Sequence, residues 1–332
     1  MKLLPFPEIP IFQSYHNKAF PFGIVQANNT SDIEKWACTK CINCVFTPYE
    51  EDHMFDVITI DPWGQEEGLI EYRDVFFDKY LLKQPNYNLL SLIRRYITQG
   101  YYVAGLYNEK YIPGKWAFER IDYYHDFLII GFDKENFISV GYLSDGRFHR
   151  YDIPNRNMYD SLTKTLFSKM WLILLKYNCG NLPIPNIDIL IAELDNYIST
   201  ADQLTLMNTP GNSFGIATMG RLKDFFVAEV KENNRIYMDR RYTRVLYEHK
   251  WVLTKVVENF LDNDKKQKIY EVAFRNYQRA KSIHMLGLKM QYTQNGKLID
   301  NAETLMNEII YEETEYIPEL INELKKKYYS KV

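Results

Sequence analysis

The sequence predicts an α+β protein, in which a mixed core over residues 1–155 is followed by a helical region over residues 156–332. Short β-rich runs separated by turn residues lie between residues 101 and 153. From about residue 157 onward, long segments carry apolar residues near helical spacing. A chain of 332 residues is long enough to bury one large core or two ordinary ones.

The β-rich runs are separated by turn signals, DKEN at Asp133 and SDG at Ser144. Three of these runs are expected to form an antiparallel meander. The four runs are Tyr101–Tyr107, His125–Phe132, Phe137–Leu143 and Arg147–Ile153.

Five segments of the second half are predicted to be helices, because their apolar residues recur near helical spacing. The connections GNLPIPN, over residues 180–186, and NTPGNSFG, over residues 208–215, are the clearest breaks between them. The predicted helices are Ser161–Tyr177, Ile187–Ile198, Arg240–Leu261, Lys268–Met290 and Asn301–Tyr329.

Composition excludes several classes of protein. Hydrophobic residues at 46% and charged residues at 25% are typical of a soluble globular chain, and a net charge of −3 gives no reason to expect a nucleic-acid partner. Prolines interrupt the N-terminal MKLLPFPEIP, and the longest apolar run, WLILL at Trp171, is too short to span a bilayer. We therefore expect a cytoplasmic protein with no membrane partner. The 15% aromatic content indicates either an aromatic-lined groove or a composition bias.

The segment FQSYHNKAFPFG, over Phe12–Gly23, is the first candidate for an active site. Ala19 is expected to begin a helix, with Pro21 tolerated in the first turn. Residue 19 is an alanine, but a thiol in its place would have its pKa lowered by the positive end of the helix dipole and by a nearby histidine. Gln13, six residues earlier, could donate its amide to a developing oxyanion.

The best candidate for a general base is His125, which starts a predicted strand. If DKEN forms a four-residue hairpin loop, Phe132 pairs with Phe137 and His125 lies opposite Ser144. Asp145 could then orient the imidazole, although this aspartate is equally suited to the SDG turn. Asp122 and Asp126 are weaker alternatives, and a structural or surface histidine is the simpler interpretation of His125.

The segment IDYYHDFLIIGFDKENFISVGYLSDGRFHRYDI resembles the histidine strand of papain-like proteins of the butirosin-H N-terminal type. QGYYVAGLYNEKYIP, FGIATMGRLKDFF and DRRYTRVLYEHK, in this order, extend the resemblance over roughly Tyr15–Leu261. It implies a papain-like core in which position 19 matches the nucleophile, Gln13 the oxyanion glutamine and His125 the base. The usual Asp or Asn after the histidine strand falls near Gly141, where this sequence departs from the pattern.

The resemblance also implies a function. Relatives of this type, including the amide-forming cysteine-protease homologues of polythioamide (closthioamide) biosynthesis, move an acyl group from a carrier-protein thioester to an amine. The expected activity is therefore a cysteine-dependent acyltransferase whose Ala19 replaces the nucleophile, by engineering or by natural loss. Its partners would be an acyl or peptidyl carrier protein and a small amine. No cofactor is expected beyond the phosphopantetheine arm that carries the substrate.

Two alternative functions remain open. A cysteine peptidase or thioester hydrolase would use the same residues with water as the acceptor. A catalytically inactive relative that binds a carrier protein or peptide would account for a native alanine at position 19.

Two further groups of residues can be interpreted either as functional or as structural. Cys38, Cys41 and Cys44 could bind zinc, but they lack a fourth ligand, and a helix after an Asp32 cap would place them in the core. The charged YEHK cluster, residues 247–250, could contact a substrate. A salt bridge to Arg240 or Arg241 is the favoured interpretation.

Overall fold

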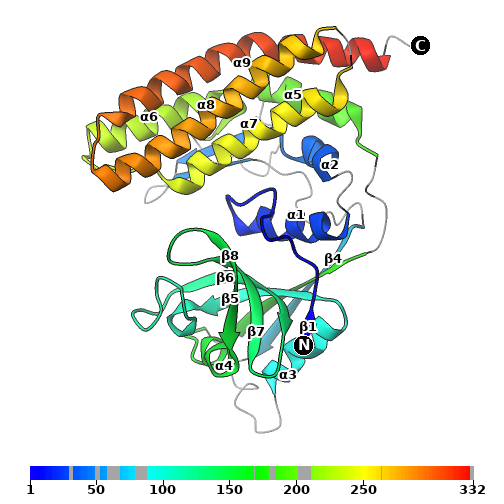
Figure 1. The fold of residues 1–332 in the computed structure, drawn as a ribbon, viewed down its shortest axis with the longest axis vertical. Coiled ribbons are helices and arrows are strands. Elements are labelled where there is room, and N and C mark those ends of the chain that lie inside the picture. The colour runs from blue at the N-terminus through cyan, green and yellow to red at the C-terminus, as the bar shows by residue number, and fades with distance from the viewer. Residues whose placement is uncertain are drawn as a thin grey trace. The chain divides into compact units, whose positions relative to one another are not determined.

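The computed structural model describes residues 1–29, 33–48, 53–57, 68–78, 88–167, 169–178, 182, 184–200, 211–262 and 264–329 (Figure 1). It contains helices and antiparallel sheets, which confirms the α+β class. The chain divides into two compact units, each built from two segments. Unit 1 comprises Met1–Thr30 and Asp61–Leu182, and unit 2 comprises Ser31–Ile60 and Pro183–Val332.

This division differs from the predicted boundary after residue 155. The segment up to residue 182 belongs to unit 1, because the strand Lys169–Tyr177 pairs with two other strands of that unit. Residues 31–60 belong to unit 2, because the strand Cys44–Pro48 pairs with Ser213–Phe214. Strand pairing between distant segments decides both assignments.

Unit 1 contains an antiparallel sheet in the order β4-β9-β5-β6-β7-β8, with β1 also pairing with β6 (Figure 1). The meander predicted from the sequence is confirmed, and all four β-rich runs take part in it as β5 to β8. The strands are β1 Lys2–Leu3, β4 Ile70–Asp78, β5 Tyr102–Asn108, β6 Tyr124–Phe132, β7 Asn136–Tyr142, β8 Phe148–Pro154 and β9 Lys169–Tyr177.

The prediction of a helix over Ser161–Tyr177 is wrong. Helix α4, Asn155–Thr163, ends early, and the apolar run continues as strand β9. β9 lies between β4 and β5, and Leu172, Leu174 and Leu175 are buried. A strand covered on both faces has a continuous apolar sequence, which periodicity cannot distinguish from a buried helix.

Helix α1, His16–Asn28, begins three residues before the predicted start at Ala19. The backbone N–H of Ala19 already donates to the carbonyl of Tyr15 at 2.8 Å, and Pro21 lies inside the helix. Most of α1 is buried, and this burial offsets the backbone hydrogen bond that proline cannot make. The other helices of unit 1 are α3 Leu89–Thr98, α4 and the 3₁₀ turn η2 Glu109–Tyr111.

Unit 2 is mainly helical, with a small antiparallel sheet in the order β10-β2-β3. The helices predicted over Ile187–Ile198, Arg240–Leu261, Lys268–Met290 and Asn301–Tyr329 are confirmed with small shifts of their ends. The elements are α2 Ile33–Lys40, β2 Cys44–Pro48, β3 His53–Val57, α5 Ile187–Ser199, β10 Ser213–Phe214, α6 Ala217–Lys231, α7 Arg240–Phe260, α8 Lys266–Thr293 and α9 Leu298–Tyr329. Among the described helices of both units, none has the length and apolarity to cross a membrane.

The CTKCINC motif is buried in unit 2, as the core interpretation predicts. Cys38 lies in α2 and its thiol approaches the carbonyl of Val252 at 3.8 Å, whereas Cys41 follows the helix and Cys44 begins β2. The predicted helix therefore carries only Cys38 of the three, because α2 ends at Lys40. The predicted cap, Asp32, lies outside the described residues.

The YEHK cluster makes a buried ion pair, but not with the predicted partners. The ammonium of Lys250 lies 2.8 Å from the Glu313 carboxylate of α9, and both side chains are fully buried. Arg241 instead pairs with Asp239 at 2.6 Å. A buried charge needs a partner that comes with it into the core, and Glu313 of α9 supplies one.

Candidate functional site

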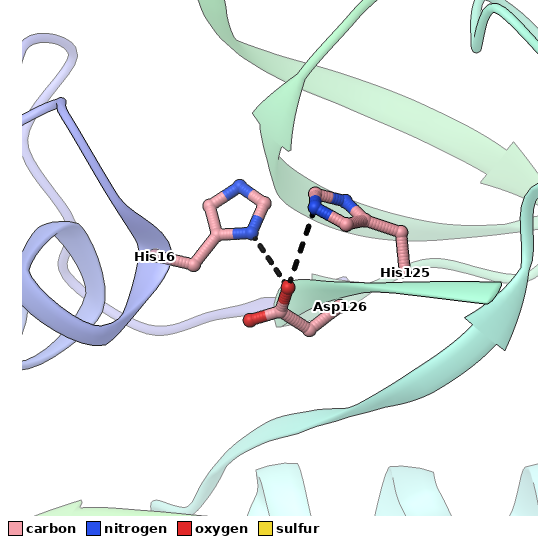
Figure 2. Close-up of side chains that lie close together, drawn as sticks. All are labelled: His16, His125 and Asp126. Atoms are coloured by element: carbon pink, nitrogen blue, oxygen red, sulfur yellow. Dashed lines mark hydrogen bonds and ion pairs between the residues drawn. The ribbon is translucent and has the colours of Figure 1, made fainter. Parts of the chain in front are cut away.

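Two imidazoles and a carboxylate meet in unit 1. His16 is the first residue of α1, and His125 and Asp126 are consecutive residues of β6. Nδ1 of His16 lies 2.9 Å from Oδ1 of Asp126, and Nε2 of His125 lies 3.8 Å from the same oxygen. Figure 2 shows both rings turned toward that oxygen. The ring centroids are 5.0 Å apart, so the three side chains form one cluster, called here the His–Asp–His centre.

Consecutive strand residues normally point to opposite faces of a sheet. β7 pairs with β6 only as far as the pair Leu128–Val140, after a register shift between Ile129 and Gly131. In the described part of the sheet, the first residues of β6 therefore have no β7 partner opposite them. At this free edge the side chains of His125 and Asp126 turn toward each other, and His16 approaches both.

His16 is the buried member of the centre. Its ring stacks on Phe20 at 4.7 Å and on Tyr142 at 5.1 Å between centroids, and its side chain is only 5% exposed. Burial, partly offset by the Asp126 carboxylate, lowers the pKa of His16. A neutral imidazole that donates Nδ1–H to Asp126 carries its lone pair on Nε2, and Nε2 has no hydrogen-bond partner among the described residues.

Asp126 is the shared anion of the centre. Partial burial opposes its ionisation, but His16 and His125 outweigh this and lower the pKa of Asp126 to about 2. The carboxylate is therefore charged at neutral pH and can accept from either imidazole.

His125 is the solvent-accessible histidine of the centre, with 38% of its side chain exposed. Its Nδ1 lies 3.4 Å from Oε1 of Glu109, the first residue of η2. Glu109 is buried and lies 3.0 Å from the ammonium of Lys115, which is also buried. Burial opposes ionisation of Glu109, but hydrogen bonding to His125 and the charge of Lys115 outweigh it and lower the pKa of Glu109. His125 thus lies between two carboxylates, one buried and one half-exposed.

The structure does not place Ala19 where the predicted nucleophile belongs. Ala19 is fully buried, one turn beyond the start of α1. The α1 side chain in contact with His125 is that of His16, which occupies the helix start. The helix begins at His16, five residues before Pro21, rather than at Ala19, two residues before it, so the residue at the N-terminus is His16.

Gln13 lies just before α1, and its side-chain amide donates to the carbonyl of Pro10 at 3.2 Å. The structure thus gives this amide a backbone partner within its own segment. The oxyanion role of Gln13 stays a prediction.

The structure gives Asp145 partners other than the predicted His125. Asp145 lies in the exposed turn between β7 and β8, where it accepts from the backbone N–H of Arg147 and contacts Nε2 of His149 at 2.8 Å. The predicted pair Phe132–Phe137 is present, but the register then shifts by one residue, and β7 ends at Tyr142. The SDG turn interpretation of Asp145 is the one that the structure supports.

The residues that contact His125 lie in segments that the sequence analysis quoted, but none of them was its leading candidate for the partner of His125. Asp126 had been weighed as a weaker alternative, whereas Glu109 and His16 were missed. Tyr107 pairs with His125 across β5 and β6, which places Glu109 beside the imidazole. His16 stood within the quoted FQSYHNKAFPFG, and a helix start placed there would have identified it. Asp122, the other alternative, contacts Asn108 and Lys110 instead.

No protein-family model matches the chain, and no curated protein matches it. The chemistry available to the centre follows from its side chains. An accessible imidazole flanked by carboxylates can accept and return a proton, and two imidazoles with a carboxylate can coordinate a cation.

Proposed function

We propose that this protein is an amide-forming acyltransferase that moves an acyl group from a carrier-protein thioester to an amine. The observation that carries the proposal is the pairing of an accessible strand histidine, His125, with the buried carboxylate of Glu109 at 3.4 Å. The pair faces the start of α1, which is the relative placement of strand histidine and helix N-terminus in papain-like enzymes. The carrier-protein thioester as acyl donor and the amine as acceptor are proposed from the resemblance of the sequence segments quoted above to papain-like proteins of the butirosin-H N-terminal type.

His125 acts as the general base. Glu109 accepts Nδ1–H, which leaves the lone pair on Nε2, the nitrogen on the Asp126 side. A distance of 3.4 Å is long for a hydrogen bond, and such catalytic pairs commonly tighten when substrate binds. Lys115 beside Glu109 keeps this carboxylate ionised and in place.

The reaction proceeds by direct attack, because the buried Ala19 offers no nucleophile. The amine nitrogen attacks the thioester carbonyl as Nε2 of His125 removes its proton. The tetrahedral intermediate then collapses, the C–S bond breaks, and the leaving thiolate takes the proton back from His125. The products are an amide and the free thiol of the carrier arm.

The pair formed by His16 and Asp126 positions and stabilises the base. When His125 is protonated, the carboxylate of Asp126 lies 3.8 Å from the new charge. Nδ1–H of His16 holds this carboxylate in place at 2.9 Å. Charge stabilisation by a group that is already oriented lowers the barrier without reorganisation.

The test is an assay of purified protein with acyl thioesters of carrier protein or pantetheine and a panel of amines, in the presence of a chelator. Mass spectrometry follows the amide, and a thiol reagent follows the released carrier arm. His125→Ala is expected to lower the rate by about 10²–10⁴, as the loss of a general base does. His149→Ala removes an equally exposed, aspartate-paired histidine and should leave the rate unchanged. Amide formation that survives His125→Ala, or none with any donor, would refute the proposal.

Thioester hydrolysis is a second candidate, favoured by the 38% exposure of the His125 side chain. Water can reach an imidazole this open and serve as the acceptor in place of an amine. The same assay separates the two reactions, because hydrolysis releases the free acid at a rate that does not depend on amine concentration.

A further inference from the structure

We infer that His16, His125 and Asp126 form a binding site for a divalent transition-metal ion, for which Zn²⁺ is the probe. One donor atom from each residue lies within 4.8 Å of the other two. Ligands bound at 2.0–2.2 Å in a tetrahedral site are about 3.4 Å apart. The observed separations of 2.9 and 3.8 Å bracket this value, so small side-chain rotations would complete the coordination.

The donor set fits a transition metal rather than Ca²⁺ or Mg²⁺. Imidazole nitrogens suit zinc, copper, iron and nickel, whereas calcium and magnesium prefer oxygen ligands. The donors come from two elements that are far apart in the chain, the start of α1 and β6. They are held by packing rather than by one flexible loop.

The burial of the three side chains leaves one side of the site open. His16 is 95% buried and its Nδ1 is directed at Asp126, whereas His125 and Asp126 are 38% and 44% exposed. Figure 2 shows that the buried ring approaches from the helix and the other two side chains from the strand. Three protein ligands with an open fourth position are typical of catalytic zinc sites.

The residues around the ligands supply an independent observation. A metal-bound histidine usually donates its second ring N–H to a carboxylate, a carbonyl or water, which fixes the orientation of the ring. Coordination through Nε2 of His125 leaves Nδ1–H facing the buried carboxylate of Glu109 at 3.4 Å. Lys115 neutralises Glu109, so this supporting carboxylate already has its own counter-charge.

The second histidine has a comparable arrangement. Coordination through Nδ1 of His16 moves the remaining ring proton to Nε2, the atom that has no hydrogen-bond partner among the described residues. Residue 141 is a glycine and has no Cβ. A Cβ placed there would lie 3.6 Å from Nε2 of His16 and 3.5 Å from the hydroxyl oxygen of Tyr151. Gly141 leaves open the space that both atoms border, and the Tyr151 hydroxyl also has no hydrogen-bond partner in the described structure.

The metal proposal does not depend on acyl transfer. A metal bound through Nε2 of His125 occupies the lone pair that the general base needs, so the two roles exclude each other at any moment. The acyltransferase is therefore tested in chelator, and the metal site is tested by binding alone. Either proposal can fail while the other stands.

The experiment is a calorimetric titration of the chelator-treated full chain with Zn²⁺, together with the visible absorption spectrum of the Co²⁺ form. One ion per chain is expected, with nitrogen and oxygen ligation in the Co²⁺ spectrum. His16→Ala, His125→Ala and Asp126→Asn should each weaken binding at least 10-fold. Glu109→Gln should weaken it about 10- to 100-fold, as the loss of a ligand-orienting group does.

The matched control is His149→Ala, which removes a histidine that also contacts an aspartate, Asp145, at 2.8 Å. This variant should bind Zn²⁺ like the parent protein. Circular dichroism checks that each variant is folded. If a histidine variant is unfolded, Zn²⁺ binding by Asp126→Asn and Glu109→Gln tests the inference in its place. The absence of stoichiometric binding, or equal binding by the folded ligand variants, would overturn the inference.

Discussion

Nδ1 of His16 lies 2.9 Å from Oδ1 of Asp126, and this contact joins the first residue of α1 to a strand 110 residues further along the chain. The helix start is the position at which papain-like enzymes carry their nucleophile. In this protein the position holds an imidazole that is paired with a carboxylate and lies against a second histidine. The centre can therefore transfer protons or coordinate a cation, but it has no thiol at the helix start.

Cysteine substitutions distinguish the two candidate nucleophile positions. A thiol introduced by Ala19→Cys would be fully buried, and burial raises the pKa of a thiol and slows its alkylation. Position 16 is also buried and lies beside the carboxylate of Asp126, and both features oppose a thiolate. A thiol introduced by His16→Cys would nevertheless lie at the helix N-terminus beside the partly exposed His125, and we expect these two features to outweigh them.

We expect native-state alkylation at position 16 to be at least 10-fold faster than at position 19, measured by mass spectrometry of peptides so that native cysteines are resolved. Faster labelling of Ala19→Cys would restore position 19 as the nucleophile site. Equal labelling of both variants after denaturation serves as the control.

Carboxylate substitutions distinguish the two candidate partners of His125. Glu109→Gln replaces the carboxylate that fixes the imidazole tautomer with a neutral amide and should lower the acyl-transfer rate by at least about 10². The rate should fall through kcat, with little change in KM. Asp145→Asn, which alters the pair with His149 in the turn between β7 and β8, should leave the rate unchanged. The reverse result would reinstate Asp145 as the orienting group.

The buried ion pair of unit 2 predicts a large and non-additive loss of stability. Lys250→Met leaves the carboxylate of Glu313 buried without its counter-ion and should lower the free energy of unfolding by about 3–5 kcal/mol. The double variant Lys250→Met/Glu313→Gln removes both charges and should recover part of that loss. Urea unfolding of Lys250→Met, Glu313→Gln and the double variant measures the coupling energy between the two residues. If the two single losses of unfolding free energy add up to that of the double variant, the ion pair contributes little.

His284 predicts a pH dependence of stability. Burial, reinforced by Arg244 and Arg240, lowers the pKa of His284 to about 4. The unfolded chain binds a proton at this histidine below about pH 6.5, whereas the folded chain does so only near pH 4. The free energy of unfolding should therefore fall as the pH drops from 6.5 to 4, by about 1–3 kcal/mol from this group.

The comparison is with His284→Gln, measured by urea unfolding at several pH values. The difference between parent and variant should be constant above pH 6.5 and change between pH 6.5 and 4. A difference that stays constant throughout this interval would show that the histidine titrates alike in both states.

Much of the fold follows from local patterns. The helices α7, α8 and α9 are amphipathic over many turns, and the runs that became β5 to β8 are separated by recognisable turns. Such signals depend only on residues close in sequence. β9 was missed because the apolar run that ends at Tyr177 carries no period, and only its place between β4 and β5 makes it a strand.

The candidate site was only partly accessible from the sequence. His125 could be recognised as a strand histidine, because a strand is a local feature. Its partners could not be recognised, since Glu109 reaches it through the register of β5 with β6, and His16 through the packing of α1 against the sheet. The register shift in β6 also changed the pairing on which the prediction for Asp145 depended.

The amino-acid sequence alone thus determined the α+β class, the meander, the long helices and the place of His125 in a strand. Tertiary structure decided which carboxylates face that histidine and which residue occupies the start of α1. The physical reason is that a side chain's chemistry belongs to its residue, whereas its partner depends on pairings over tens to hundreds of residues, where a shift of one position changes the neighbour.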